Sequence, residues 1–334
     1  MHRSGSAFAF ALLTLLLSAP GAHADALSDP LWVTVTADSV SAAPDTTAAL
    51  PLNPQALSDA TPHERPKRSL VHSLGHGAHV FLSDGWFIVT SPTRMSMSDA
   101  MKTTAVFGVA TGLYMNDQEI HDQMQAARGD PLYEIFKKPG RQWEPVGYMG
   151  NTNKWYVAAL VTGYTFRIEP LTVIPAQILE SHMISAGIRN AVKPLVGRTR
   201  PFDGYGPHHF EFLGPGTSFP SGHASVDFEL ATILSHHVPA KFWPAKVALY
   251  YAAASMAAQR VESDGHWMSD VWLSSIQGYL VARTVVTRHD QRVAKEKEQQ
   301  QNAPGSGPGA ITGSLEPALE FHDGVPMAVW TVHF

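Results

Sequence analysis

The sequence predicts an all-α fold, a bundle of helices around one apolar core. Hydrophobic residues make up 44% of the 334 residues and charged residues 16%, a balance that can fill a sizeable core. Several apolar segments also repeat at helical spacing, whereas alternation typical of strands is weak and confined to the end of the chain. We therefore expect one main domain.

The N-terminus has the features of an export signal. His2 and Arg3 precede an apolar run over residues 7–17, and Ala22-His23-Ala24 is a small-x-small cleavage pattern. Residues 1–24 are therefore expected to be a signal peptide, with a retained membrane anchor as the alternative, although the run is short for spanning. The expected location is periplasmic or secreted, with membrane association left open.

Composition suggests the other boundaries. Residues 25–68 are rich in Ala, Ser, Thr, Asp and Pro, which predicts a flexible linker before the main domain at residues 69–292. Residues 293–334 are expected to be a low-complexity linker and a C-terminal tail. Weak alternation on either side of Asp323-Gly324 is compatible with a small hairpin in this tail.

Capping residues and apolar spacing predict the helices. Ser98-Asp99 offers an N-cap and Asn116-Asp117 a stop, while residues 79–89 fit short strands or a buried loop equally well. The charge-free stretches are shorter than the ~18–20 apolar residues of a spanning helix, so we expect buried helices of a bundle. The predicted helices cover residues 100–115, 118–127, 155–166, 170–193, 220–237, 247–259 and 266–286.

Several kinds of chemistry are excluded or disfavoured. The chain has no cysteine, which rules out disulfides, thiolate metal sites and cysteine nucleophiles. A net charge of −5 gives no broad basic surface, so no nucleic-acid partner is expected. No metal site is expected either, because no carboxylate pattern accompanies the histidine groups, which are His72, His76 and His79, the pair at 208–209 and the pair at 236–237.

Arg260, His266 and Asp270 form one candidate cluster. Residues four apart share a helix face, so Asp270 could accept the proton of one imidazole nitrogen of His266 and leave the other nitrogen as a nucleophile. Arg260 could hold phosphate oxygens. Taken alone, the His–Asp pair could equally be a surface pair.

A second cluster is Pro220-Ser221-Gly222-His223, which opens a predicted helix. Gly222 lets the backbone approach a ligand, the N–H groups of a helix start favour an anion, and Ser221 adds a hydroxyl donor. His223 could protonate a departing oxygen. Without the other clusters, an N-cap beside an incidental histidine would explain this segment as well.

A third cluster, Lys193 with Arg200-Pro201, follows a helix end. Two cations that converge there suit a phosphate, although a solvated basic turn is the simpler interpretation of the local sequence. Arg198 is a spare cation that we rank below Arg200.

In order, Lys193-x6-Arg200-Pro201, Pro220-Ser221-Gly222-His223 and Arg260-x5-His266-x3-Asp270 resemble the signature of the type 2 phosphatidic acid phosphatase superfamily. This superfamily also contains bacterial non-specific acid phosphatases and vanadium haloperoxidases. The third motif of the family usually begins Ser-Arg, whereas Gln259 precedes Arg260 here. The resemblance implies the helical bundle of this superfamily and a metal-independent phosphatase without a cofactor.

The resemblance also implies a role for each motif residue. His266 would attack phosphorus to form a phosphohistidine, Asp270 would orient it, and His223 would protonate the leaving alcohol and then activate water. The groups expected to bind the phosphate are Lys193, Arg200, Ser221, Gly222 and Arg260.

Two other functions stay open. A vanadate-dependent haloperoxidase would hold vanadate on His266, but such enzymes are usually considerably longer than this chain. A non-catalytic periplasmic protein that binds phospholipid is the other. Among phosphatase substrates, the sequence does not choose between soluble phosphomonoesters and lipid phosphates or diphosphates, and it leaves a peripheral membrane contact and the oligomeric state open.

Overall fold

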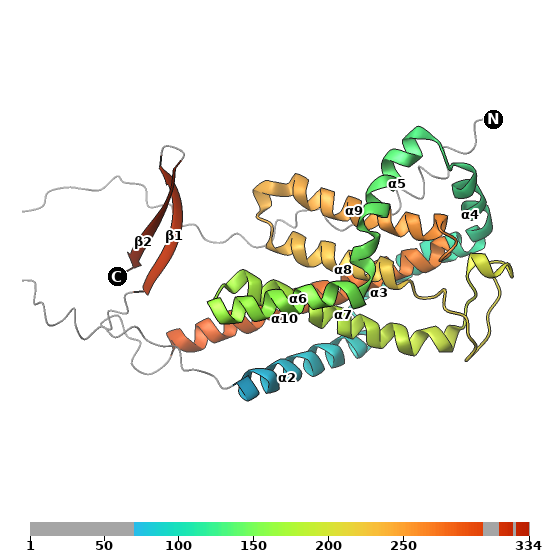
Figure 1. Ribbon diagram of the computed structural model, residues 1–334. Helices are drawn as coiled ribbons and strands as arrows, with labels where there is room; N and C mark the ends of the chain where they lie inside the picture. Colours follow the sequence, from blue (N-terminus) through green and yellow to red (C-terminus); the bar gives the residue numbers. More distant parts are fainter. Residues whose placement is uncertain (1–69, 303–313, 323–324, 334) are drawn as a thin grey trace, which may run out of the picture. The chain divides into compact units, whose positions relative to one another are not determined.

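The computed structural model describes residues 70–302, 314–322 and 325–333 (Figure 1). Helices make up most of residues 70–302, as expected for an all-α fold. The expected signal peptide and the linker at 25–68 lie outside the described residues. The α-helices are α2 (Leu70–Val89), α3 (Met97–Met115), α4 (Asp117–Ala126), α5 (Pro131–Trp143), α6 (Met149–Phe166), α7 (Glu169–Val196), α8 (Gly222–His237), α9 (Trp243–Glu262) and α10 (Met268–Gln301), and the 3-10 helices are η1 (Ser91–Arg94), η2 (Glu144–Gly147), η3 (Pro201–Asp203) and η4 (Ala240–Phe242).

The chain divides into two compact units, one ending at Thr284 and the other beginning at Val285. The second unit contains the rest of α10 and a two-stranded antiparallel sheet of β1 (Ser314–His322) and β2 (Val325–His333). Weak alternation of hydrophobic residues in the tail was compatible with a small hairpin, and this sheet is that hairpin.

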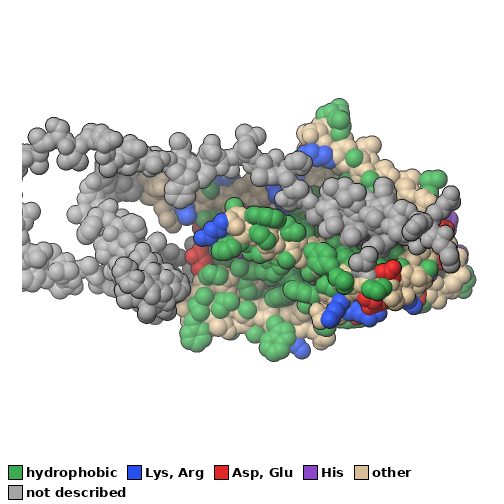
Figure 2. Space-filling view, turned by 90° about the horizontal axis from the view of Figure 1, so that it is seen from above, with side chains coloured by type: hydrophobic (Ala, Val, Ile, Leu, Met, Phe, Trp, Pro, Cys, Tyr) green, Lys and Arg blue, Asp and Glu red, His purple; other side chains and the backbone are tan. Residues whose placement is uncertain are grey.

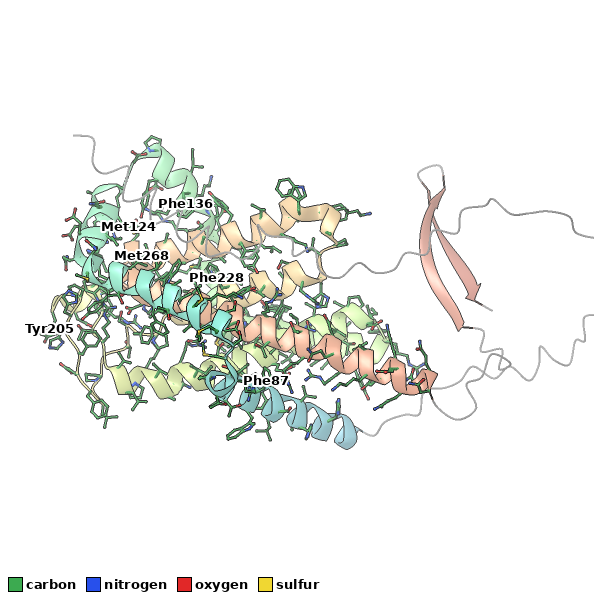
Figure 3. All side chains as sticks on the ribbon, turned by 180° about the vertical axis from the view of Figure 1, so that it is seen from behind. Phe87, Met124, Phe136, Tyr205, Phe228 and Met268 are labelled. Atoms are coloured by element: carbon green, nitrogen blue, oxygen red, sulfur yellow. The ribbon has the colours of Figure 1, made fainter. Side chains whose placement is uncertain are left out.

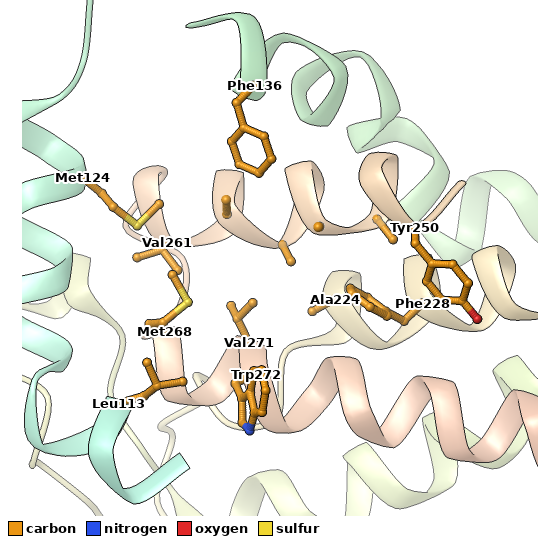
Figure 4. Close-up of a cluster of buried hydrophobic side chains, with 14 of the residues drawn as sticks. Leu113, Met124, Phe136, Ala224, Phe228, Tyr250, Val261, Met268, Val271 and Trp272 are labelled. Carbon is orange, nitrogen blue, oxygen red and sulfur yellow. The ribbon is translucent and has the colours of Figure 1, made fainter. Parts of the chain in front are cut away.

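The hydrophobic core lies where α3, α4, α5, α8, α9 and the start of α10 meet (Figure 4). Helices α8 and α9 form a helical hairpin, and α5 packs on α9 (Figure 1). The core face of α9 consists largely of alanines, so its neighbours approach it closely. Larger side chains such as Phe136, Phe228, Met268 and Trp272 fill the remaining space. The beginning of α10 is therefore anchored in the core.

Two segments differ from the sequence-based expectation. Residues 79–89, which fitted strands or a loop, belong to helix α2. Leu82, Trp86 and Val89 of this helix are largely exposed, so it shows no core-facing stripe from which its period could be recognised. Helix α5 was not expected from the sequence, where Pro139 interrupts an otherwise amphipathic pattern.

Helix boundaries also differ. Helix α3 is capped by Ser96 instead of Ser98: the Ser96 hydroxyl accepts a hydrogen bond from the Asp99 N–H, and the Asp99 carboxylate accepts one from the Ser96 N–H. Helix α10 begins at Met268, so His266 precedes the helix on which it was predicted.

No helix among the described residues is long and apolar enough to cross a membrane. Hydrophobic side chains nevertheless cover much of the face seen in Figure 2.

Buried ionisable groups lie where α7 packs against α8. His182 and Glu229 are both fully buried, with 3.8 Å between Nε2 of His182 and Oε2 of Glu229. Burial lowers the pKa of His182 to about 4 and raises the pKa of Glu229 to about 8. Both groups are therefore mainly neutral near pH 7, and their contact is not an ion pair.

The substitution Glu229→Gln removes the ionisable group and keeps its shape. Because the pKa of Glu229 rises from 4.5 to about 8 on folding, the wild type takes up a proton on folding between these pH values and loses stability there as the pH rises. We expect the stability of the variant relative to wild type to increase across this window, by at most about 1.4 kcal/mol per pH unit, and to level off above it.

Thermal and urea unfolding at a series of pH values measures this difference. The variant Glu211→Gln, at an exposed glutamate, should show no such trend. A Glu229→Gln difference that stays constant with pH would contradict the assignment of a neutral Glu229.

Candidate active site

The three motif segments meet at one end of the bundle, where helices end or begin. Lys193 is in the last turn of α7 and Arg260 in the last turn of α9, while Ser221 is the N-cap residue of α8. Gly197 ends α7 in the left-handed conformation (φ 57°), and a Cβ there would lie 1.7 Å from the Glu211 carbonyl oxygen. A glycine is therefore required where the chain turns from Lys193 toward Arg200.

His266 is held in one tautomer by the backbone. Its side chain is 4% exposed, and Nδ1 lies 2.6 Å from the Ser218 carbonyl oxygen. A carbonyl oxygen only accepts hydrogen bonds, so Nδ1 carries the proton and Nε2 keeps a free lone pair. Burial, together with the charges of Arg200 and Lys193, holds the pKa of His266 well below its ordinary value. The imidazole is therefore neutral and can act as a nucleophile.

Asp270 is not the hydrogen-bond partner of His266 that the sequence spacing predicts. Its carboxylate accepts hydrogen bonds from Arg198 Nη1 (2.6 Å), the Ser218 hydroxyl (2.5 Å) and the Trp267 N–H (3.1 Å). The reason is that His266 precedes α10, so the shared helix face does not exist. Ser218 connects the two residues instead: its carbonyl oxygen accepts a hydrogen bond from His266, and its hydroxyl donates one to Asp270.

Arg198, considered a spare phosphate ligand, is buried and fully engaged. Nη1 donates to Asp270, and Nη2 donates to Asp117 at 2.7 Å and to the Pro207 carbonyl at 2.7 Å. The rings of Tyr114, Phe210 and Trp267 surround its guanidinium. Its side chain is therefore a structural counter-ion and is not directed at a substrate.

Asp117 is a residue that the sequence analysis missed. It is fully buried and also accepts hydrogen bonds from the Ser269 N–H (2.9 Å) and hydroxyl (2.5 Å). From the sequence, Asn116-Asp117 was interpreted only as the end of the helix predicted at residues 100–115. Its partners Arg198 and Ser269 lie 81 and 152 residues away from Asp117 along the chain, so no local signal could have identified it.

Lys193 and Arg200 are both fixed by Thr217. Lys193 Nζ donates to the Thr217 carbonyl oxygen (2.6 Å), and Arg200 Nε donates to its hydroxyl (3.0 Å). Burial and the charges of Arg200 and Arg189 lower the pKa of Lys193 to about 8. Burial and the charge of Arg260 likewise lower the pKa of Arg200. Like charges held this close favour a bound anion.

The start of α8 presents polar atoms without a protein partner. Ser221 forms no side-chain cap, and among the described residues its Oγ, His223 Nε2 and Arg260 Nε are buried without a hydrogen-bond partner. Buried polar groups are nearly always paired, so these three atoms indicate a site for a ligand with several oxygens. The Gly222 N–H is at the first position of the helix, where an N–H group has no partner within the helix and can donate to an anion.

His223 faces an open groove of about 410 Å³, lined also by Tyr148, Met149 and Asn151. Burial, followed by the charge of Arg260, lowers the pKa of His223 to about 4. The rings of His223 and Tyr148 meet in a T-shaped arrangement, with 4.5 Å between centroids. The groove gives the group attached to a bound phosphate a place beside His223.

Within the described part of the chain, no group of three or more His, Asp or Glu side chains is placed to hold a metal ion. His76 and His79 both lie on α2.

One comparison with known proteins matches the part of the chain that contains the three motifs. Residues 175–294 match the model of the PAP2 superfamily, which confirms the resemblance carried by the three motifs. At the level of the family, the expectation of a phosphatase is confirmed as well. The search of curated proteins gives no match. The crystal structure of Aquifex aeolicus LpxE is similar to 51% of this chain and 94% of its own, with 21% identity and a TM-score of 0.37.

Replacing Arg198 with Met should strongly destabilise the fold, because Asp117 and Asp270 then remain buried without their counter-ion. The expected loss in the free energy of unfolding is about 3–5 kcal/mol. Arg141→Met is the control: this side chain is 55% exposed, and its loss should cost less than ~1 kcal/mol. Urea unfolding measures both, and similar losses for the two variants would contradict the role of Arg198.

Proposed function

We propose that this chain is a metal-independent phosphohydrolase that acts through a phosphohistidine on His266, and that its substrates are phosphomonoesters or lipid (di)phosphates. The observation that carries the proposal is the contact between His266 Nδ1 and the Ser218 carbonyl, which leaves Nε2 unprotonated beside phosphate-binding cations. The family match supports the reaction class, and the proposed site residues are those of its three motifs.

In the first step, Nε2 of His266 attacks phosphorus and the bond from phosphorus to the leaving oxygen breaks. His223 donates its proton to that oxygen, so the product leaves as an alcohol. Lys193, Arg200 and Arg260, together with the Ser221 hydroxyl and the Gly222 N–H, stabilise the charge on the three equatorial oxygens. The phosphohistidine keeps the proton on Nδ1, and the Ser218 carbonyl faces this positive ring.

In the second step, His223 accepts a proton from water, whose oxygen attacks phosphorus as the bond to Nε2 breaks. Phosphate leaves, and both histidines return to their starting protonation states. In the free protein, burial and then the charges of Arg260, Arg200 and Arg189 disfavour the protonated form of His223. A phosphate dianion offsets these charges and raises the pKa of His223, so substrate binding itself prepares the proton donor.

Exposed aromatic side chains at Arg200 and in the loop that follows it support an amphiphilic substrate, such as a lipid phosphate. Phe202 is 63% exposed, and its ring lies 5.6 Å from the guanidinium of Arg200. Tyr205 and Phe212, in the same loop, are 67% and 74% exposed, and Tyr205 lies at the edge of the helical unit (Figure 3). The Leu213 N–H donates to the Pro194 carbonyl, so the backbone of this loop is tied to α7. We also propose export to the periplasm or medium, which the composition of residues 1–24 supports.

His266→Ala should abolish phosphate release, by about 10³-fold or more, while inorganic phosphate still binds to the cations. The measurement is phosphate release in the presence of a chelator, with p-nitrophenyl phosphate and with phosphatidic acid in micelles. Release from micelles alone would identify a lipid enzyme, and release from both a broad phosphatase. Full activity in the variant would exclude His266 as the nucleophile.

His223→Asn should affect substrates according to their leaving group. An alkyl phosphate needs a proton on the departing oxygen, so kcat/KM should fall by about 10²–10⁴. p-Nitrophenolate leaves without a proton, so its kcat/KM, which reports the steps up to the phosphohistidine, should fall at least about tenfold less. Equal losses for the two substrates would rule out His223 as the proton donor.

A further inference from the structure

The phosphate-binding residue Arg260 is held from outside the matched segment. Its Nη1 donates to Glu144 Oε1 at 3.1 Å, and its Nη2 donates to the Ser263 hydroxyl at 3.1 Å. Glu144 opens η2, thirty-one positions before the segment 175–294 begins, and the pair is partly buried, with side chains 12% (Arg260) and 32% (Glu144) exposed. Glu144 therefore belongs to none of the three motifs.

This arrangement leaves one edge of the guanidinium for a ligand. Nε and Nη2 form that edge, and Nε is buried without a partner among the described residues. A Cβ on Gly265 would lie 3.3 Å from Nη2 and 3.6 Å from Nε. The free edge therefore faces the backbone immediately before His266, in space that a side chain at position 265 would crowd. An oxygen of a phosphoryl group attacked by His266 can accept from this edge.

Charge gives Glu144 a second effect. Burial and the charges of Arg260, Arg200 and Arg189 disfavour protonated His223, and Glu144 is the acidic group that opposes those charges. Tyr148 connects the two residues, because its hydroxyl donates to Glu144 Oε1 (3.4 Å) and its ring contacts His223. Without Glu144, Arg260 would be freer to move, and the positive field on His223 would be stronger.

We propose that Glu144 is a positioning residue of the phosphohydrolase reaction: it aims the Nε–Nη2 edge of Arg260 at the phosphoryl group. The inference rests on the proposed function. It also assigns to η2, which the motifs do not include, a direct part in organising the site.

The test compares Glu144→Ala, Glu144→Gln and the control Glu119→Ala, which changes an exposed glutamate on α4. Glu144→Ala should lower kcat/KM by about 10–100-fold, mainly through a higher KM; this is the loss typical when a group that orients a metal ligand is removed. It should also weaken binding of inorganic phosphate in calorimetry. Glu144→Gln keeps the acceptor oxygen, so it should restore KM, while the alkaline limb of its kcat–pH profile moves to lower pH. The control should match wild type.

Each outcome decides the matter. Wild-type kcat/KM and phosphate affinity in Glu144→Ala, within about twofold, would overturn the inference and leave the proposed function standing. So would equal losses in the Ala and Gln variants together with a lowered melting temperature, because a merely structural role predicts that pattern. A wild-type protein that neither binds inorganic phosphate nor releases it from any substrate would instead refute the proposed function, and the inference with it.

Discussion

The contact of Arg198 with two buried carboxylates is the interaction on which the site depends. It joins α4 through Asp117, the loop after α7 through Pro207, and α10 through Asp270. Taking three charges out of water costs several kcal/mol per ion, and only the close paired geometry and the additional hydrogen bonds compensate for it. Asp270 in turn fixes the Ser218 hydroxyl, and the Ser218 carbonyl fixes His266. The tautomer of the proposed nucleophile is thus determined by an ion pair that it does not touch.

The sequence predicted the fold well wherever apolar side chains recur on one helix face. Helices α7, α8 and α9 were all anticipated, although α9 begins several residues earlier than its apolar run. α2 was not recognised, because its large hydrophobic side chains are exposed and its period has no core to mark it. α5 was missed because Pro139 lies inside it, although its buried Tyr133 and Phe136 follow helical spacing.

The residues proposed to react with or bind phosphate could be predicted from the sequence, but the groups that hold those residues in position could not. The side chains proposed to touch phosphate carry recognisable motifs, and the structure brings them together at one end of the bundle. The groups that orient them carry no motif. Carbonyl oxygens of Thr217 and Ser218 hold Lys193 and His266, and a carbonyl is present at every position of a chain. Asp117 and Glu144 reach the site only through tertiary packing, which spacing along the sequence does not encode.

The positions of Asp117 and Glu144 in the chain indicate how long a fragment must be to form a complete site. Both precede residue 175, where the match to the superfamily begins. A fragment cut at that boundary would retain all three motifs, yet Arg198 would face a single acid and Arg260 would lose its carboxylate partner. The smallest piece that keeps both arginines in place therefore reaches back to α4. The limits of a recognisable family segment and those of a self-sufficient module need not coincide.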